Sequence, residues 1–305
     1  MIKLSNGHEL RYIVASGAAG FDGQWWLHEK PLVWLGLIKP ELFTIGIRTL
    51  TRYPRLYPVS NLSWRRPRTW LPWSSQSCIR FLPGGGAINK VGLYNPGIDL
   101  WIDTIYPRIK NTKTPLIGSI NGNEEELMYT AKKFNDRPPF VALELNESCP
   151  NTGHPMDQAN TVIKSVLAVK KVSSLPLILK VSVDQDYLAI ARGVAGAVEA
   201  ISLNTVPWKL VFPDKESPLE KIGKPGSGGG GVSGPPAQRL NWTAVTYLAK
   251  QGLVPVIGPS AMNSDDVYKL ECRGAKAISF GTIHLRTPWR PTSIVLGEMR
   301  KNRQN

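Results

Sequence analysis

From about residue 115 onward, short apolar runs alternate with stretches of helical periodicity, and this alternation constrains the fold more than any other feature. The apolar runs are short and nearly continuous, as expected for parallel strands covered on both faces. The predicted strands are residues 115–120, 140–146, 175–182, 200–204, 254–258 and 276–281. The predicted helices are residues 124–134, 157–172, 187–194, 241–251 and 264–272. This order indicates a parallel sheet wrapped by helices.

Two further apolar runs, residues 12–15 and 43–48, lie upstream and complete a set of eight predicted strands. Eight is the number of strands that closes a (β/α)8 barrel. The pattern alone is also compatible with an open doubly wound sheet. A chain of 305 residues, 42% of them hydrophobic and 20% charged, can bury one such core. We therefore expect an α/β fold, a (β/α)8 TIM barrel that forms a single domain over residues 1–305.

Two segments interrupt the alternation of strands and helices. Residues 52–86 are rich in Pro, Trp and Arg and are predicted as an irregular insertion. Residues 206–239 are rich in Pro and Gly and are predicted as one long loop. Because loops of this length in compact domains are usually functional, we expect the second segment to belong to the active site.

The charge and the cysteines limit what the chain can bind. Its net charge is +14, from 37 basic and 23 acidic residues, which can attract nucleic acid, anionic lipid or an anionic substrate. A generally basic surface explains the charge equally well. Cys78, Cys149 and Cys272 lack metal-ligand spacing, so we expect no metal site and a reducing, cytoplasmic compartment. We see no apolar signal segment, and no apolar run approaches the roughly 20 residues of a spanning helix.

Two candidate functional side chains fall where a barrel carries its chemistry, at or near the ends of strands. Cys149 follows Asn146 in a loop with Pro150, and a thiol held there can serve as a general base or nucleophile. Lys180 lies within an apolar strand, where a lysine is costly unless it meets an anionic or electron-rich partner. The alternative for Lys180 is a side chain that reaches solvent at the strand end.

Glycines and amides supply a second group of candidates. The glycines at 228–231 and the pair Gly281-Thr282 could bring backbone amides to a phosphate, although a glycine run is also typical of a flexible linker. Asn146 and Asn204 end two predicted strands. Their side chains offer both donors and acceptors, which suits a planar ligand with amide groups.

Together these segments resemble the dihydroorotate dehydrogenase family. The most specific match is Asn-x-Ser-Cys-Pro-Asn at residues 146–151, which resembles the family's active-site loop. Six more motifs occur in the family's order along the chain: Ala15-Ser16-Gly17, residues 89–97, residues 179–182, Asn204-Thr205, residues 230–234 and Gly281-Thr282. A cysteine in the base position resembles the soluble class of the family, since the membrane-associated class has serine there.

The resemblance implies an enzyme of pyrimidine biosynthesis that holds FMN at the C-terminal ends of the strands and oxidises dihydroorotate to orotate. Cys149 is implied as the base that takes the C5 proton while the C6 hydride passes to FMN. The implied substrate contacts are Arg48, Asn89, Val91, Gly92, Leu93, Asn146, Asn151, Asn204 and Thr205. The implied FMN contacts are Ala15, Ser16, Gly17, Arg48, Asn89, Asn146, Lys180, Asn204, Gly230, Gly231, Gly258, Ser260, Ala261, Gly281 and Thr282.

The chain departs from the family pattern at two places. Arg48 stands where the family usually has lysine, and residues 258–261, Gly-Pro-Ser-Ala, stand where it has Gly-x-Gly-Gly. Arginine keeps the charge but is bulkier, and two Cβ atoms enter where glycine is normal. Whether these departures weaken FMN binding stays open at the level of sequence.

Three other functions fit the same residues. They are a tRNA-dihydrouridine synthase, another dihydropyrimidine flavin oxidoreductase, and a degenerate barrel that binds flavin poorly and acts as a binding module. The charge favours the first, but Asn151 after Cys-Pro and the glycines at 230–234 disfavour it, so we do not expect a nucleic-acid partner.

The resemblance also implies partners. It implies a homodimer and an electron-transfer partner subunit, while fumarate, NAD through that partner, and quinone all remain open as electron acceptors. The short helical-looking stretch of mixed polarity at residues 28–42 leaves peripheral membrane contact open but not favoured.

Overall fold

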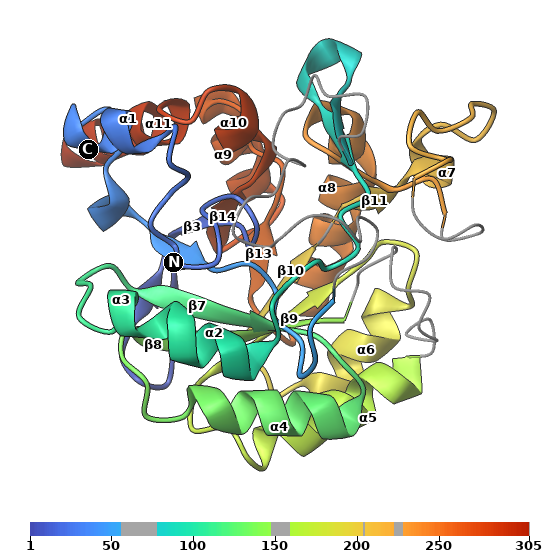
Figure 1. Cartoon of the computed structure of the whole chain (residues 1–305). Coiled ribbons are helices and arrows are strands. Elements are labelled where there is room, and N and C mark those ends of the chain that lie inside the picture. The colour runs from blue at the N-terminus through green and yellow to red at the C-terminus, as the bar shows by residue number, and fades with distance from the viewer. Residues whose placement is uncertain (56–77, 148–158, 204, 223–227, 305) are drawn as a thin grey trace.

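The central feature of the computed structural model is a closed barrel of eight parallel strands (Figure 1). The structure describes residues 1–55, 78–147, 159–203, 205–222 and 228–304. In barrel order the strands are β3 (Tyr12–Val14), β4 (Thr44–Gly46), β7 (Leu116–Ile120), β8 (Phe140–Asn146), β9 (Leu177–Val181), β10 (Ala200–Leu203), β13 (Val256–Gly258) and β14 (Ala277–Phe280). Because β14 pairs with β3, the ring is closed. The predicted barrel is confirmed and the open sheet is excluded.

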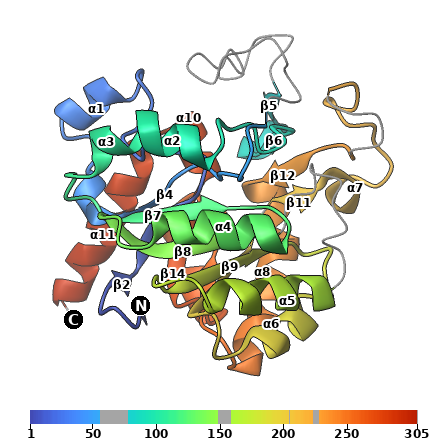
Figure 2. The ribbon, with the colours of Figure 1, turned by 60° about the horizontal axis from the view of Figure 1, so that its bottom comes forward.

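Helices surround the barrel, and each of the five predicted ones is present. They are α4 (Glu124–Phe134), α5 (Ala159–Lys170), α6 (Tyr187–Val194), α8 (Pro235–Gln251) and α9 (Ser264–Cys272). Figure 2 shows α4, α5 and α6 side by side along the barrel. Helix α4 starts at a capping box, in which the Asn123 side chain accepts from the Glu126 amide and the Glu126 carboxylate accepts from the Asn123 amide. The apolar face of α4, with Leu127, Ala131 and Phe134, is fully buried.

Helix α8 begins six residues earlier than predicted. Pro235 and Pro236 occupy its first turn, where proline is favourable because the first helical amides have no intrahelical partner. The prolines suggested a loop in the sequence, although they begin the helix in the structure. Helix α1 (Lys30–Trp34) lies within the helical-looking stretch at residues 28–42. The remaining helices were not predicted, and most of them are short: α2 (Ile98–Thr104), α3 (Tyr106–Ile109), α7 (Trp208–Val211), α10 (Thr282–Arg286) and α11 (Arg290–Gln304). No helix in the described ranges is long and apolar enough to cross a membrane.

A short N-terminal hairpin covers one end of the barrel. Strands β1 (Ile2–Lys3) and β2 (Glu9–Leu10) pair antiparallel. Their buried side chains Ile2 and Leu10 pack with inward-facing residues from the starts of the barrel strands, among them Ile13 and Ile117. Because this end is packed with apolar side chains, the opposite, C-terminal end is left for function, as in other barrels of this kind.

The C-terminal end carries a four-stranded antiparallel sheet in the order β11 (Val206–Pro207), β12 (Gly231–Ser233), β6 (Ala87–Asn89) and β5 (Ile79–Phe81). It lies at the end of the barrel away from the N-terminus (Figure 2). The prediction of one long loop over residues 206–239 is therefore wrong, because that span contains β11, α7, β12 and the start of α8. Pro207 is tolerated because β11 is an edge strand.

The same sheet shows that the segment 52–86, predicted as an irregular insertion, is regular at its C-terminal end. Residues 56–77 lie outside the described ranges, but β5 and a 3-10 turn (Pro83–Gly85) order its end. The sheet has a small core of its own, formed by Ile88, Val206, Val232 and Trp208 together with Leu219 and Ala237. The strands are only two or three residues long, and β12 pairs with β6 across about half of the chain, so local patterns in the sequence do not reveal the sheet.

Candidate active site

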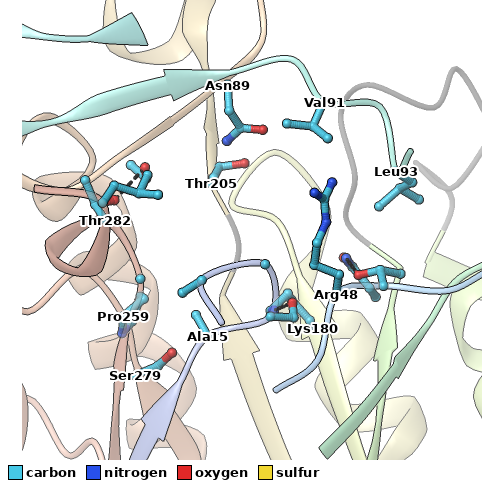
Figure 3. A pocket seen from close by; sticks show the side chains of 18 of the residues that line it. Ala15, Arg48, Asn89, Val91, Leu93, Lys180, Thr205, Pro259, Ser279 and Thr282 are labelled. Atoms are coloured by element: carbon cyan, nitrogen blue, oxygen red, sulfur yellow. Dashed lines mark hydrogen bonds between the residues drawn. The ribbon is translucent and has the colours of Figure 1, made fainter. Parts of the chain in front are cut away.

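A pocket lies at the C-terminal ends of the barrel strands, close to the four-stranded sheet (Figure 3). Its lining includes fourteen of the predicted site residues: Ala15, Ser16, Gly17, Arg48, Asn89, Val91, Gly92, Leu93, Asn146, Lys180, Thr205, Ser260, Gly281 and Thr282. Gly230, Gly231, Gly258 and Ala261 are described but do not line it. Cys149, Asn151 and Asn204 lie outside the described residues.

The pocket also has lining residues that were not among the predicted contacts, although Tyr94, Ser233 and Pro259 lie within the motifs. They are Ala18, Thr49, Ile79, Tyr94, Leu203, Ser233, Pro259, Ser279 and Leu285. Most of them are within a few residues of a predicted contact in the sequence. Their position in or next to the motifs was the one feature of the sequence that could have identified them. Apolar and hydroxyl side chains are common in a sequence, whereas a lysine within an apolar strand is conspicuous.

Lys180 on β9 is held at the floor of the pocket by a buried ion pair. Its Nζ lies 2.8 Å from Glu144 Oε1 and donates to Ser16 Oγ at 2.9 Å. Lys180 is 6% exposed and Glu144 is 8% exposed. The alternative in which Lys180 reaches solvent is therefore excluded.

Asn146 is fixed at the end of β8 by a chain of hydrogen bonds. Its Nδ2 donates to Thr49 Oγ1 at 2.9 Å, and Thr49 Oγ1 lies 2.9 Å from Ser119 Oγ. Ser119 Oγ donates in turn to Glu144 Oε1 at 2.9 Å. Asn121 Nδ2 donates to the Asn146 carbonyl at 2.7 Å. The side chain of Asn146 is thus held in one orientation by neighbours that are themselves bonded.

Arg48 extends from the end of β4 into the pocket (Figure 3). Its guanidinium lies over the Phe21 ring, 4.8 Å from the centroid, and Nη2 is 3.5 Å from the Tyr94 carbonyl. Burial lowers the pKa of Arg48 to about 10, so the side chain is still a cation at neutral pH. Among the described lining residues, Arg48 and Lys180 are the charged ones, and both are cationic. The pocket is therefore suited to an anionic or electron-rich ligand.

The loop after β6 presents Val91, Gly92 and Leu93 to the pocket in a fixed turn. Gly92 and Leu93 both have positive φ, 65° and 57°. The fully buried Asn95 holds the turn, since its Nδ2 donates to the Leu93 carbonyl at 2.7 Å and its Oδ1 accepts from the Gly97 amide at 2.9 Å. Asn95 is thus a structural residue of the motif rather than a lining residue.

Gly231 is required by the packing between Asn89 and Thr205. It pairs with Asn89 across β12 and β6, and its carbonyl lies 3.4 Å from Asn89 Nδ2. A Cβ at Gly231 would overlap Thr205 Oγ1. The glycine therefore allows Thr205 to reach the pocket, which explains the place of Gly231 in the motif.

The loop after β13 keeps a conformation that glycine favours, although the residue there is Ser260. Ser260 has φ 66°, in the left-handed region. Its carbonyl accepts from Gln238 Nε2 at 3.0 Å, and Trp242 Nε1 donates to the Pro259 carbonyl at 3.0 Å. These bonds from α8 hold the loop in place, so the serine bears the steric strain of its Cβ.

A Ser260→Gly variant should raise the free energy of unfolding by about 0.5–1 kcal/mol, because glycine adopts this φ without a clash. Denaturant unfolding at an unchanged m value would measure it. The matched control is Ser279→Gly in β14, where glycine should be destabilising. Equal or lower stability of Ser260→Gly would show that the strain is not significant.

Glu147 is a buried carboxyl group directly after β8. It is 2% exposed, and its Oε1 has no hydrogen-bond partner among the described residues. Its backbone is held by the Lys180 carbonyl and by Gln185 Nε2. Burial raises the pKa of Glu147 to about 8, so the folded protein keeps this carboxyl protonated at neutral pH.

This pKa makes stability fall as the pH rises. Between the ordinary carboxyl pKa of 4.5 and about 8, the folded state holds a proton at Glu147 that the unfolded state has lost. We expect Glu147→Gln to match the parent at pH 5 and to exceed its free energy of unfolding at pH 8.5 by roughly 2–5 kcal/mol. Thermal unfolding at both pH values measures this difference, and an equal effect at both would contradict it.

Comparisons with known proteins agree with the geometry. The family model of dihydroorotate dehydrogenase matches residues 78–297. The catalytic subunit of dihydroorotate dehydrogenase B (NAD(+)) from Bacteroides thetaiotaomicron is 34% identical over 215 residues, 67% of this chain and 68% of that protein. The corresponding subunit from Desulforamulus reducens is 32% identical over 224 residues, 70% and 71% of the two chains. The chain therefore belongs to the dihydroorotate dehydrogenase family.

A solved structure supports the same fold. Dihydroorotate dehydrogenase from Eimeria tenella, crystallised with ferulenol, has a TM-score of 0.72 at 17% identity and covers 99% of this chain and 84% of that chain. At this identity the likeness shows the barrel fold alone. Family membership makes the chain an FMN-dependent oxidoreductase that acts on CH–CH donors.

The pocket fits FMN by the chemistry of its donors. Lys180 and Ser16 bring a buried cation and a hydroxyl to one side of the pocket, which suits the electron-rich edge of a flavin ring. Ser260 lines it from the loop after β13, and Gly281 and Thr282 line it at the start of α10, directly after β14, where backbone amides suit a phosphate. No acidic side chain of the described residues lines the pocket.

Proposed function

We propose that this enzyme oxidises dihydroorotate to orotate in pyrimidine biosynthesis, with Cys149 as the base that takes the C5 proton. The observation that supports dihydroorotate as the substrate is the charge of the pocket. Its charged lining residues, Arg48 and Lys180, are both cations, and dihydroorotate carries a carboxylate. Bound FMN would accept the hydride from C6. Cys149 follows the pocket residue Asn146 by three positions, which supports a place close to the substrate.

The described residues divide the remaining work. Arg48 would bind the substrate carboxylate, and Asn146 and Asn89 would hydrogen-bond the ring amides. Asn151 and Asn204 would share this role, as the family resemblance implies. Held in the orientation described above, Asn146 would fix the ring relative to the base, which is the usual contribution of a positioned amide to rate.

Holding FMN would fall to a larger set of residues. They are Ala15, Ser16, Gly17, Lys180, Ser260, Gly281 and Thr282, which line the pocket, and Gly230, Gly231, Gly258 and Ala261, each of which neighbours a lining residue or another of these glycines in the sequence.

The names of the relatives support a further part of the proposal. Both are catalytic subunits of an NAD(+)-dependent enzyme, so we infer an electron-transfer partner subunit for this chain as well. A homodimer and a cytoplasmic location complete the proposal. The partner would pass electrons from the flavin to NAD.

A substrate panel tests the proposed function. The purified enzyme with FMN and an artificial electron acceptor should convert dihydroorotate to orotate, identified by chromatography. Dihydrouracil, which lacks the carboxylate, should react at least about 100-fold more slowly if Arg48 binds that group as a buried charge pair. If dihydrouracil is turned over faster than dihydroorotate, or if uridine in tRNA is reduced, the enzyme is one of the other flavin oxidoreductases.

A further inference from the structure

Glu144 lies beneath the pocket without lining it, and no part of the proposed reaction uses it. It sits two residues before Asn146 on β8, with its side chain turned toward the barrel interior. Its Oε1 meets two donors, Lys180 Nζ at 2.8 Å and Ser119 Oγ at 2.9 Å. A carboxylate buried to this extent is costly unless it is paired, so its partner indicates its role.

The ion pair determines where the Lys180 ammonium lies and how much of its charge the pocket experiences. Nζ is held between Glu144 Oε1 and Ser16 Oγ, and Ser16 lines the pocket. Ser119 fixes the carboxylate from the other side and is linked through Thr49 to Asn146. The negative charge of Glu144 therefore offsets part of the cation at a fixed distance. Arg48 is the other described charge in the pocket lining.

We propose that Glu144 is a positioning residue that directs the Lys180 ammonium toward the pocket and, by offsetting its charge, sets the reduction potential of the bound flavin. The inference rests on the proposed function, because it takes FMN as the occupant beside Lys180. A flavin gains electron density on reduction, so a less compensated cation beside it favours the reduced form. Glu144 thus keeps that preference moderate, which allows electrons to leave for the acceptor.

The test compares the dissociation constants of oxidised and reduced FMN in Glu144→Gln and in the parent enzyme. Glutamine keeps an oxygen that accepts from Lys180 but removes the charge. The ratio of the two constants should shift about tenfold toward the reduced form, which is a potential about 30 mV more positive for a two-electron couple. The potential is measured by anaerobic titration against a reference dye, without any substrate.

Two variants show whether the effect passes through Lys180. In a Lys180→Met background no ammonium is left for Glu144 to position or offset, so adding Glu144→Gln should shift the potential by a clearly smaller factor than it does in the parent. Ser119→Ala removes a hydrogen bond from the same carboxylate but not its charge, and should change the ratio less than about threefold. An unchanged potential in Glu144→Gln, or an equal shift in both backgrounds, overturns the proposal.

The proposal can be tested even if the Glu144→Gln variant does not fold. If Glu144→Gln leaves Lys180 too poorly compensated to fold, Glu144→Asp keeps the charge but withdraws it by one methylene, and should shift the potential in the same direction by a smaller factor. A parent enzyme that binds no FMN would contradict the proposed function instead. A parent enzyme that binds FMN and oxidises dihydroorotate, with a potential insensitive to Glu144, would contradict this inference alone.

Discussion

A Cys149→Ala variant should keep FMN bound and lose about 10²–10⁴-fold in the rate at which dihydroorotate reduces the flavin, because removal of a general base slows proton transfer by that factor. The rate is measured by anaerobic stopped-flow absorbance, which isolates the reductive step from the electron acceptor. Cys149→Ser should be slow at neutral pH, since a hydroxyl is a weaker base than a thiolate.

Cys272 provides the matched control for this variant. It is an exposed free thiol at the end of α9, outside the pocket lining, so Cys272→Ala should reduce at the parent rate. Cys78 is unsuitable as a control because it is fully buried. If Cys149→Ala were reduced within about threefold of the parent rate, another group would have to take the C5 proton.

An Arg48→Met variant should weaken orotate binding by about 100-fold, or roughly 2.7 kcal/mol, because it removes a buried cation from a pocket meant for a carboxylate. Orotate binding is measured from the perturbation of the flavin spectrum. Arg48→Lys restores the charge and the usual family residue, so it should recover most of the affinity. It would also lose the contact with the Phe21 ring, which lies 4.8 Å from the guanidinium.

Arg52 is the matched control, four residues further along. It pairs with Glu125 at 2.6 Å and does not line the pocket, so Arg52→Met should bind orotate as the parent does. Parent-like affinity in Arg48→Met would mean that the carboxylate binds elsewhere. The prediction is therefore specific to the cation at the end of β4.

The barrel was predictable because its strands are buried on both faces and read as short apolar runs. All eight predicted strands are present, with ends that differ by at most a few residues. The sheet over the pocket was not predictable, because Gly231 pairs with Asn89 across 142 residues of sequence. Nothing local in either segment indicates that pairing, whereas barrel strands carry their own apolar pattern.

In the active site, too, some features could be predicted from the sequence and others could not. Lys180 was recognised from the sequence because it is a charged residue within an apolar strand, and the structure places it in the pocket lining. Its partner Glu144 did not stand out, since pairing the two requires the register of β8 and β9, in which Asn146 lies opposite Lys180. Ser260 was recognised as a departure from glycine, but only the structure shows its positive φ. Side-chain type is visible in a sequence, while partners and backbone strain come from the fold.

Anaerobic titration of the FMN-loaded enzyme with dihydroorotate measures the proposed reductive reaction without any electron acceptor. We expect the visible flavin absorbance to bleach with one equivalent of dihydroorotate per flavin, orotate to be recovered, and oxygen to restore the spectrum. A flavin spectrum that dihydroorotate leaves unchanged, in an enzyme that holds FMN, would contradict the proposed function.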